Sequence, residues 1–165
     1  MRPVALIGPM AAGKSSVGRK LASRMGATFV DTDREIVREH GPIADLFAEQ
    51  GEPAFRAIEE DVVAASLVDG AVVSLGGGAP LAAGTQERLA AARVVLLMID
   101  DRQAERRIAG SSRPLLADGG IDAWRRILAE REPTYRALAD LEVDASRRRM
   151  SDIVADIATW LEEHP

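Results

Sequence analysis

Gly8-Pro9-Met10-Ala11-Ala12-Gly13-Lys14-Ser15 decides the fold of this 165-residue chain, because it matches the phosphate-loop pattern G-x-x-x-x-G-K-[ST] without a gap. Backbone N–H groups in such a loop cradle phosphate oxygens, and the N-terminus of the following helix adds partial positive charge. We therefore expect the loop and the adjacent Ser16 to bind ATP, with Lys14 at the β- and γ-phosphates and Ser15 on Mg²⁺. The alternative is a simple glycine turn between a strand and a helix.

The sequence on either side of the loop predicts the strand and the helix that the phosphate-loop interpretation requires. An apolar run at residues 4–7 reads as a buried parallel strand, and residues 14–25 carry apolar side chains at helical spacing. Further strands are expected at residues 28–30, 71–75, 94–99 and 141–143. Further helices are expected at residues 34–68, with breaks at 41–42 and 51–53, and at residues 102–108, 121–138 and 151–161. Strands that alternate with helices imply an α/β fold with a parallel sheet covered on both faces.

Pro133 and Ser151 allow predictions about the course and the start of two of these helices. Pro133 lies inside the helix at 121–138, where it should kink or restart the helix because it lacks an N–H group. Ser151 stands at the start of the last helix, where its hydroxyl is expected to act as the N-cap.

The composition argues against several classes of protein. A net charge of −5 and a pI near 5.1 do not suit a nucleic-acid-binding protein. No apolar run approaches the ~20 residues of a membrane helix, and Met1-Arg2-Pro3 leads directly into the first strand instead of into a signal peptide. Cysteine is absent, so disulfides and thiolate metal sites are excluded. We expect one cytoplasmic domain without a membrane or nucleic-acid partner.

An acidic pair, Asp31 and Asp33, follows the strand at 28–30. Ligands bind at the carboxyl ends of strands in open α/β sheets, and alternate residues of a strand point in different directions. One carboxylate could therefore face the metal while the other faces an acceptor hydroxyl and takes its proton. Alternatively, Asp33 only caps a helix that begins at Arg34.

Three consecutive glycines, Gly76-Gly77-Gly78, end the strand at 71–75. Without side chains they would let backbone N–H groups approach an anion or a hydroxyl closely, although a tight turn would also explain them. Ser74 lies directly before them and could reach the shell of the metal.

Arg56, Arg113 and Arg136 are candidates for binding an anionic ligand, because a guanidinium group can pair with a carboxylate or a phosphate through two hydrogen bonds. Taken alone, Arg56 and Arg136 are each better explained as surface residues. Arg113 differs because it follows the flexible stretch Ala109-Gly110-Ser111-Ser112, as an arginine of a mobile lid would.

Taken together and in this order, these motifs resemble those of the shikimate kinase family over the whole chain. The resemblance is carried by the phosphate loop, Asp31-Thr32-Asp33, Phe55-Arg56 with Glu59, the three glycines, Arg113-Pro114-Leu115-Leu116, and Tyr135-Arg136. It implies a three-layer fold like that of the nucleoside monophosphate kinases, with a five-stranded parallel sheet in the order 2-3-1-4-5. It further implies one kinase domain over residues 1–165, a shikimate-binding region at roughly 31–61 and a lid at roughly 109–120.

The same resemblance implies roles for individual residues. Asp33 would hold the reacting hydroxyl and serve as base, Lys14 and Arg113 would act on the transferred phosphate, and Arg113 would also contact ATP. Shikimate would be bound by Asp33, by Arg56 oriented by Glu59, by Arg136, and by backbone N–H groups at Gly76, Gly77 and Gly78. Ser15 would bind Mg²⁺, with Asp31 and Ser74 reaching it through water. Arg107 and Arg148 would form the walls of the adenine site.

The predicted activity is thus transfer of the γ-phosphate of ATP to the 3-hydroxyl of shikimate by a monomeric, Mg²⁺-dependent enzyme. Two other functions share the phosphate loop. A related kinase, such as a gluconate kinase, would need no paired arginines for a ring carboxylate. A nucleotide-binding regulatory protein would use the γ-phosphate to order a switch segment and would have no acceptor.

Overall fold

The computed structural model describes residues 1–109 and 119–165, and at its centre lies a parallel sheet in the order β2-β3-β1-β4-β5. The strands are β1 (Val4–Ile7), β2 (Thr28–Asp31), β3 (Ala71–Ser74), β4 (Arg93–Met98) and β5 (Leu141–Asp144). Each neighbouring pair runs parallel. The strand order implied by the family resemblance is therefore confirmed.

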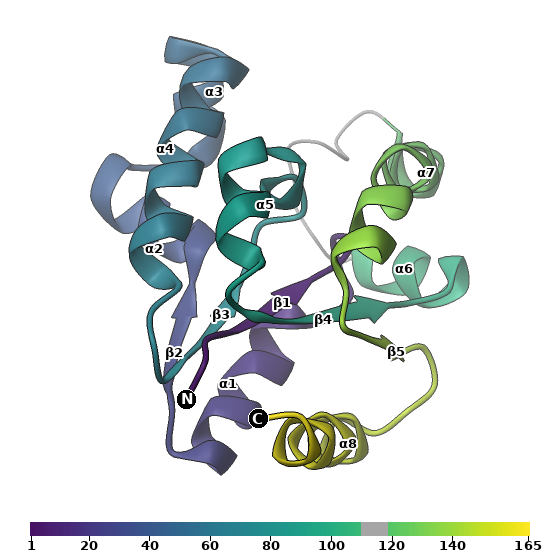
Figure 1. Cartoon of the computed structure of the whole chain (residues 1–165). Helices are drawn as coiled ribbons and strands as arrows, with labels where there is room; N and C mark the ends of the chain where they lie inside the picture. Colours follow the sequence, from purple (N-terminus) through teal and green to yellow (C-terminus); the bar gives the residue numbers. More distant parts are fainter. Residues whose placement is uncertain (110–118) are drawn as a thin grey trace.

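Helices cover both faces of this sheet, which makes three layers (Figure 1). The helices are α1 (Lys14–Met25), α2 (Thr32–His40), α3 (Ile43–Gln50), α4 (Glu52–Ser66), η1 (a 3₁₀ turn, Ala79–Leu81), α5 (Ala83–Leu89), α6 (Asp101–Ile108), α7 (Gly120–Leu138) and α8 (Met150–Glu163). Figure 1 shows α1 and α8 on one face and α5 and α7 on the other. Within the described part of the chain, no helix combines the length and the apolar composition needed to cross a bilayer.

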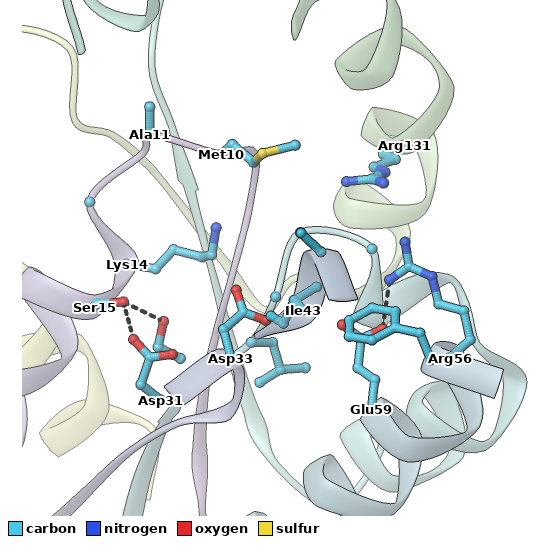
Figure 2. Close-up of a pocket in the computed structure, with 18 of the residues that line it drawn as sticks. Met10, Ala11, Lys14, Ser15, Asp31, Asp33, Ile43, Arg56, Glu59 and Arg131 are labelled. Carbon is cyan, nitrogen blue, oxygen red and sulfur yellow. Dashed lines mark hydrogen bonds and ion pairs between the residues drawn. The ribbon is translucent and has the colours of Figure 1, made fainter. Parts of the chain in front are cut away.

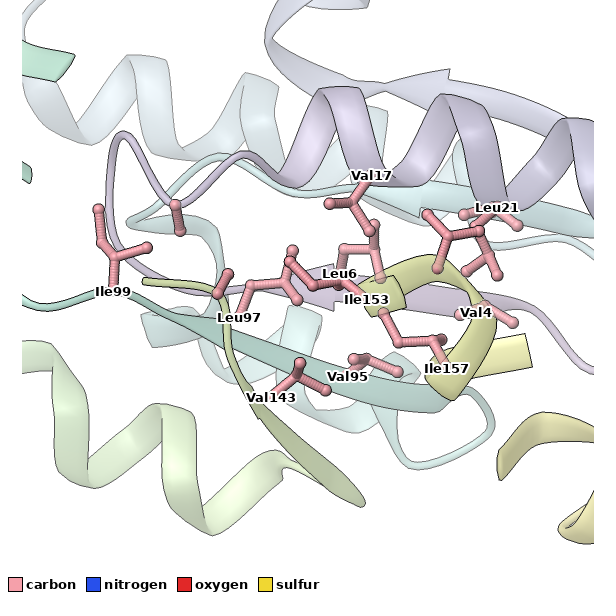
Figure 3. Packing of buried hydrophobic residues seen from close by; sticks show 14 of the residues in the cluster. Val4, Leu6, Val17, Leu21, Val95, Leu97, Ile99, Val143, Ile153 and Ile157 are labelled. Carbon is pink, nitrogen blue, oxygen red and sulfur yellow. The ribbon is translucent and has the colours of Figure 1, made fainter. Parts of the chain in front are cut away.

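The core is divided by the sheet according to the alternation of side chains along each strand. Val4 and Leu6 of β1 face α1 and α8, whereas Ala5 and Ile7 face the opposite layer. Figure 3 shows the first of these two clusters, in which Ile157 of α8 packs against the same face of the sheet that α1 covers. Because both faces are buried in the middle of the sheet, the central strands β1, β3 and β4 are mostly apolar at consecutive positions, whereas the edge strands β2 and β5 include polar residues.

A third, smaller cluster holds α2, α3 and α4 together at one end of the sheet. It consists of Ile36, Leu46, Phe55 and Val62, and the rings of Phe47 and Phe55 are in contact with centroids 4.7 Å apart and planes tilted by 38°. Glycines at the breaks, Gly41 and Gly51, end α2 and α3 with positive φ angles of 86° and 82°. These three helices are the segment that carries the acceptor-side candidates Asp33 and Arg56.

One local expectation about helices is wrong, and the restart that was one of the two expected effects of Pro133 does not occur. Helix α8 begins at Met150 with Arg149 at the N-cap position and no side-chain cap, so Ser151 is already inside its first turn. Helix α7 runs without a restart from Gly120 to Leu138 and includes Pro133. Burial explains this continuity: Trp124 before the proline and Tyr135 after it are both packed in the core, which outweighs the lost N–H group.

Removal of Ile157 should measure what the contact between α8 and the sheet contributes. Its side chain is fully buried, so Ile157→Ala leaves a cavity and should lower the free energy of unfolding by about 2–5 kcal/mol. The matched control is Val68→Ala, whose side chain is 54% exposed and should change stability by no more than about 0.5 kcal/mol. Urea unfolding of both variants tests this, and equal losses would contradict the assignment of the core.

Candidate active site

A cavity of about 680 Å³ opens where the carboxyl ends of β1, β2 and β3 meet the phosphate loop (Figure 2). The register of the parallel strands creates this convergence, because Asp31 lies opposite Ser74 and Ser74 lies opposite Leu6, just before the loop. The cavity is lined on one side by Lys14, Ser15 and Ser16, and on the other by Phe55, Arg56, Glu59 and Arg131.

The phosphate loop connects β1 to α1 in the conformation that its motif requires. Gly8 has a φ of 141°, and a Cβ there would lie 2.2 Å from the backbone oxygen of Leu97 in β4, so only glycine fits. The Nζ of Lys14 donates to the backbone oxygens of Gly8 and Pro9, at 2.8 and 3.0 Å. Figure 2 shows the Lys14 ammonium group pointing into the cavity, where a phosphate chain lying along the loop would meet it.

Ser15 joins the first acidic residue and Ser74 in one cluster of oxygen atoms. The Ser15 hydroxyl donates to Asp31 Oδ2 at 2.5 Å and lies 3.4 Å from the Ser74 hydroxyl. Mg²⁺ prefers oxygen ligands and keeps several waters, so it typically uses only one or two carboxylates together with substrate phosphates. The three residues predicted to hold Mg²⁺ are thus brought together, and their chemistry fits that ion. The described residues contain no group of three or more His, Asp or Glu side chains able to hold a metal alone.

The two aspartates where β2 ends and α2 begins have separate positions in the structure. Asp31 is the N-cap of α2, because its Oδ1 accepts from the backbone N–H of Arg34, and the helix begins at Thr32. The alternative in which Asp33 only caps a helix is therefore wrong. Asp33 lies in the first turn of α2 and lines the cavity between Lys14 and Glu59 (Figure 2).

Arg56 and Glu59 form an ion pair on the acceptor side of the cavity. Arg56 Nη1 donates to Glu59 Oε1 at 2.7 Å, and a longer contact of 3.4 Å joins Arg56 to Glu52. Glu59 is only 2% exposed, and this burial raises the pKa of its carboxyl group although Arg56 opposes the shift. The pair fixes the guanidinium group at the cavity wall, as expected for Glu59 orienting Arg56.

The three glycines let the site side chains approach the main chain. A Cβ on Gly76 would lie 2.7 Å from Asp33 Oδ1, one on Gly77 would lie 3.0 Å from Arg131 Nη1, and one on Gly78 would lie 2.4 Å from Arg56 Nη1. The close approach of these three side chains explains why all three positions are glycine better than a tight turn alone does. The N–H of Gly76 donates to Thr32 Oγ1 at 3.2 Å, so this donor serves the fold.

The structure does not bring Arg136 to the cavity. Its side chain is 55% exposed and pairs with Glu132 and Glu142 at 3.0 and 3.2 Å. The arginine of α7 that lines the cavity is Arg131, which is 9% exposed. Five residues of helix rotate the direction of a side chain by about 140°, so Arg131 and Arg136 lie on nearly opposite faces.

The spacing of residues in the sequence also indicates Arg131. The motif Tyr135-Arg136 had instead directed the prediction to the next arginine. Tyr135 lies four residues after Arg131, on the same face of α7, and it is fully buried. Its hydroxyl donates to the backbone oxygen of Gly77 at 2.5 Å. Burial raises the pKa of Tyr135, while the charge of Arg131 and its hydrogen bond to the hydroxyl oppose this shift. Tyr135 therefore ties Arg131 to the glycine segment.

Arg107 and Arg148, the two candidates for the adenine site, do not line this cavity. Arg107 Nη1 donates to the backbone oxygen of Ala11 at 2.6 Å, so Arg107 lies over the phosphate loop. Arg148 pairs with Asp156 at 2.5 Å and lines a separate polar cavity with Arg102 and Arg106. Arg113 and most of the expected lid at 109–120 fall outside the described residues.

Comparison with known proteins agrees with this geometry. The family model of shikimate kinase matches residues 10–162, which is most of the chain. The chain belongs to the shikimate kinase family. A shikimate kinase from Mycobacterium avium (strain 104) is 45% identical over 160 residues, which are 94% of this chain and 91% of that protein.

Solved structures of a shikimate kinase and of another kinase have folds similar to that of this chain. A shikimate kinase from Acinetobacter baumannii in complex with shikimate superposes with a TM-score of 0.93 at 31% identity, and the match covers 99% of this chain and 94% of that one. A deoxyadenosine kinase from M. mycoides, at 14% identity and a TM-score of 0.65, covers 99% of this chain and 100% of that one. This second likeness shows the fold alone. The predicted family, fold class and activity as an ATP-dependent kinase acting on a hydroxyl of shikimate are confirmed.

Adding one methyl group to Gly78 should test whether the family site depends on close approach of the main chain. The new Cβ of Gly78→Ala would meet the guanidinium group of Arg56 at 2.4–2.7 Å, so that side chain must move. We expect the shikimate KM to rise about tenfold or more, which corresponds to the loss of one charged hydrogen bond. The Tm should change little.

The matched control is Gly84→Ala in α5, where a Cβ would displace only the carboxylate of Glu60 outside the cavity. It should leave the shikimate KM within about twofold of the parent value. Steady-state kinetics with shikimate measures the KM of both variants. An unchanged KM in Gly78→Ala would show that shikimate binding does not depend on the observed position of Arg56.

Proposed function

We propose that this chain transfers the γ-phosphate of ATP to the 3-hydroxyl of shikimate inside the described cavity. The observation that carries the proposal is the distribution of charge along one cavity. Lys14 and Asp33 lie where a phosphate and a hydroxyl would meet, and Arg56 and Arg131 lie beyond Asp33 (Figure 2). An acceptor that carries both a hydroxyl and a carboxylate, such as shikimate, matches this order.

Arg56 and Arg131 are proposed to bind the carboxylate of shikimate, with Arg131 in the role that the family resemblance implied for Arg136. Both guanidinium groups border the same glycine segment, since Gly77 adjoins Arg131 and Gly78 adjoins Arg56. A carboxylate has two oxygens and accepts hydrogen bonds from two guanidinium groups at once. Glu59 and Tyr135 hold these two arginines before the acceptor binds.

Asp33 is proposed to hold the reacting hydroxyl of shikimate and to accept its proton. Its position in the first turn of α2 places it between the phosphate loop and Arg56. A positioned carboxylate orients the attacking oxygen and removes its proton as the bond to phosphorus forms. Lys14 donates to the phosphate oxygens, where negative charge accumulates in the transition state.

Ser15, Asp31 and Ser74 are proposed to hold Mg²⁺, with Ser15 as direct ligand and the other two acting through water. When bound, this ion neutralises the charge of the β- and γ-phosphates. The cluster of one carboxylate and two hydroxyls leaves room for waters and phosphate oxygens, which suits the coordination of Mg²⁺.

Residues 31–61 are proposed as the shikimate-binding region, because α2, α3 and α4 share the small core around Ile36 and Phe55 and carry Asp33 and Arg56. A single kinase domain over 1–165, a lid at 109–120 with Arg113 on the transferred phosphate, a monomeric state and a cytoplasmic location stay predictions. A gluconate kinase or a regulatory nucleotide-binding protein would not need two arginines held at the far end of the cavity.

Substitution of Arg131 and of Arg136, two of the arginines of α7, should distinguish the residue that is proposed to bind the carboxylate from the exposed one. Arg131→Ala removes a charged hydrogen bond worth about 1.5–3 kcal/mol, so the shikimate KM should rise roughly 10- to 150-fold. Arg136→Ala breaks only exposed ion pairs and should change KM less than about twofold.

An ADP-release assay with shikimate, with gluconate and without acceptor measures both effects. The affinity for ATP without shikimate should be the same in both variants. A larger rise in KM for Arg136→Ala than for Arg131→Ala would contradict the proposed carboxylate site.

Asp33→Asn should lower turnover far more than it weakens substrate binding. The amide retains the size of the side chain but cannot accept the proton, and loss of a positioned base typically costs about 10²–10⁴-fold. We expect this loss in kcat, with MgATP affinity within about threefold of the parent. If MgATP affinity collapses while kcat at saturation survives, Asp33 belongs to the nucleotide side of the cavity.

A further inference from the structure

Ala11 of the phosphate loop has a backbone conformation that a side chain disfavours. Its φ is 66°, and among the described residues it is the only non-glycine with a positive φ. In the left-handed region a Cβ crowds the following carbonyl oxygen, whereas glycine adopts the same angles freely. Such a conformation persists only where surrounding contacts hold it.

The peptide groups on both sides of Ala11 are held by side chains from outside the loop. Trp124 Nε1 of α7 donates to the backbone oxygen of Met10 at 2.9 Å. Arg107 Nη1 of α6 donates to the backbone oxygen of Ala11 itself at 2.6 Å. The first bond fixes the peptide plane before the Ala11 Cα and the second fixes the plane after it, so together they restrain φ and ψ of this residue.

We propose that Trp124 and Arg107 are positioning residues that keep Ala11 in the left-handed conformation and thereby hold the phosphate loop ready for nucleotide. The proposal rests on the assignment of this loop to the phosphates of ATP. The loop binds phosphate through successive N–H groups, whose directions are set by the dihedral angles of residues such as Ala11. A loop that leaves this conformation must return to it before binding, which reduces the apparent affinity.

Packing alone is a competing explanation for Trp124. It is 3% exposed and belongs to the core cluster beside α1 and α8, so an aromatic ring at this position would be useful without any hydrogen bond. The indole N–H separates the two explanations. Trp124→Phe keeps an aromatic ring in the core and removes the donor to Met10.

Isothermal titration calorimetry with MgADP should show the effect of removing this donor. We expect the Kd of Trp124→Phe to rise about threefold to tenfold, which corresponds to one neutral hydrogen bond. The shikimate KM and kcat at saturating ATP should stay within about twofold, because bound phosphates then hold the loop. The control is Trp160→Phe, which removes the other tryptophan of the chain. Trp160 belongs to α8 and stacks on His164, so its replacement should not change the Kd.

Ala11→Gly provides the decisive comparison. Glycine populates the left-handed region without support, so Trp124→Phe in the Ala11→Gly background should change the Kd for MgADP less than about twofold. An equal rise in Kd in both backgrounds would overturn the proposal and leave Trp124 as a packing residue. An unchanged Kd of Trp124→Phe in the parent background would overturn it as well.

Arg107 needs a probe without adenine, since the family resemblance also places it at the adenine site. Magnesium pyrophosphate presents phosphate groups alone. Arg107→Ala should weaken its binding about threefold or more, and Ala11→Gly should again reduce the effect. Weaker binding of MgADP combined with unchanged binding of pyrophosphate would assign Arg107 to adenine and exclude it from the support of Ala11.

Discussion

Parallel pairing of β1 with β3 and β4 is the constraint on which the rest of this structure depends. Parallel strands end at one common edge, and the register sets Asp31 beside Ser74 and Ser74 beside Leu6. The phosphate loop leaves β1 at this same edge. The cluster of Ser15, Asp31 and Ser74 that is proposed to hold Mg²⁺, the proposed acceptor side and the phosphate loop therefore share one cavity without any long connection between them. The two buried faces of the sheet, each packed by helices, keep this edge fixed.

Within that frame, the acceptor side is built from charges that approach the main chain closely. Glu59 is buried beside Arg56, and its raised pKa reflects the loss of solvent around the carboxyl group. A buried ion pair contributes little to stability when its desolvation is included, but it holds a guanidinium group in one direction. The glycine triplet completes the arrangement because a methyl group at any of its positions would press on a site side chain.

The phosphate loop shows how neighbouring elements can support an unfavourable local conformation. Gly8 is required by the backbone of β4, whereas Ala11 carries a Cβ in the left-handed region. The side chains of α6 and α7 reach the loop carbonyls on either side of Ala11, so the loop is not independent of the rest of the molecule. Affinity for the nucleotide is then a property of three elements that are distant in the sequence.

By itself, the sequence determined the loop motif, the five strands, most of the helices and the acidic pair, because these depend on local spacing and apolar periodicity. It did not predict the short elements η1 and α5, which lie between β3 and β4. The strand order came from the family resemblance of the motifs. Only the tertiary structure decided between Arg131 and Arg136, since both are arginines of one helix and only packing against the sheet fixes which face meets the cavity. The same holds for Pro133, which the buried side chains on both sides keep inside α7, and for the contact of Trp124 with Met10. Trp124 and Met10 lie 114 positions apart in the sequence, and local patterns carry no information about such a contact. Helical spacing places Arg131 on the face of Tyr135, but only packing against the sheet shows that this face meets the cavity and that Pro133 stays within the helix.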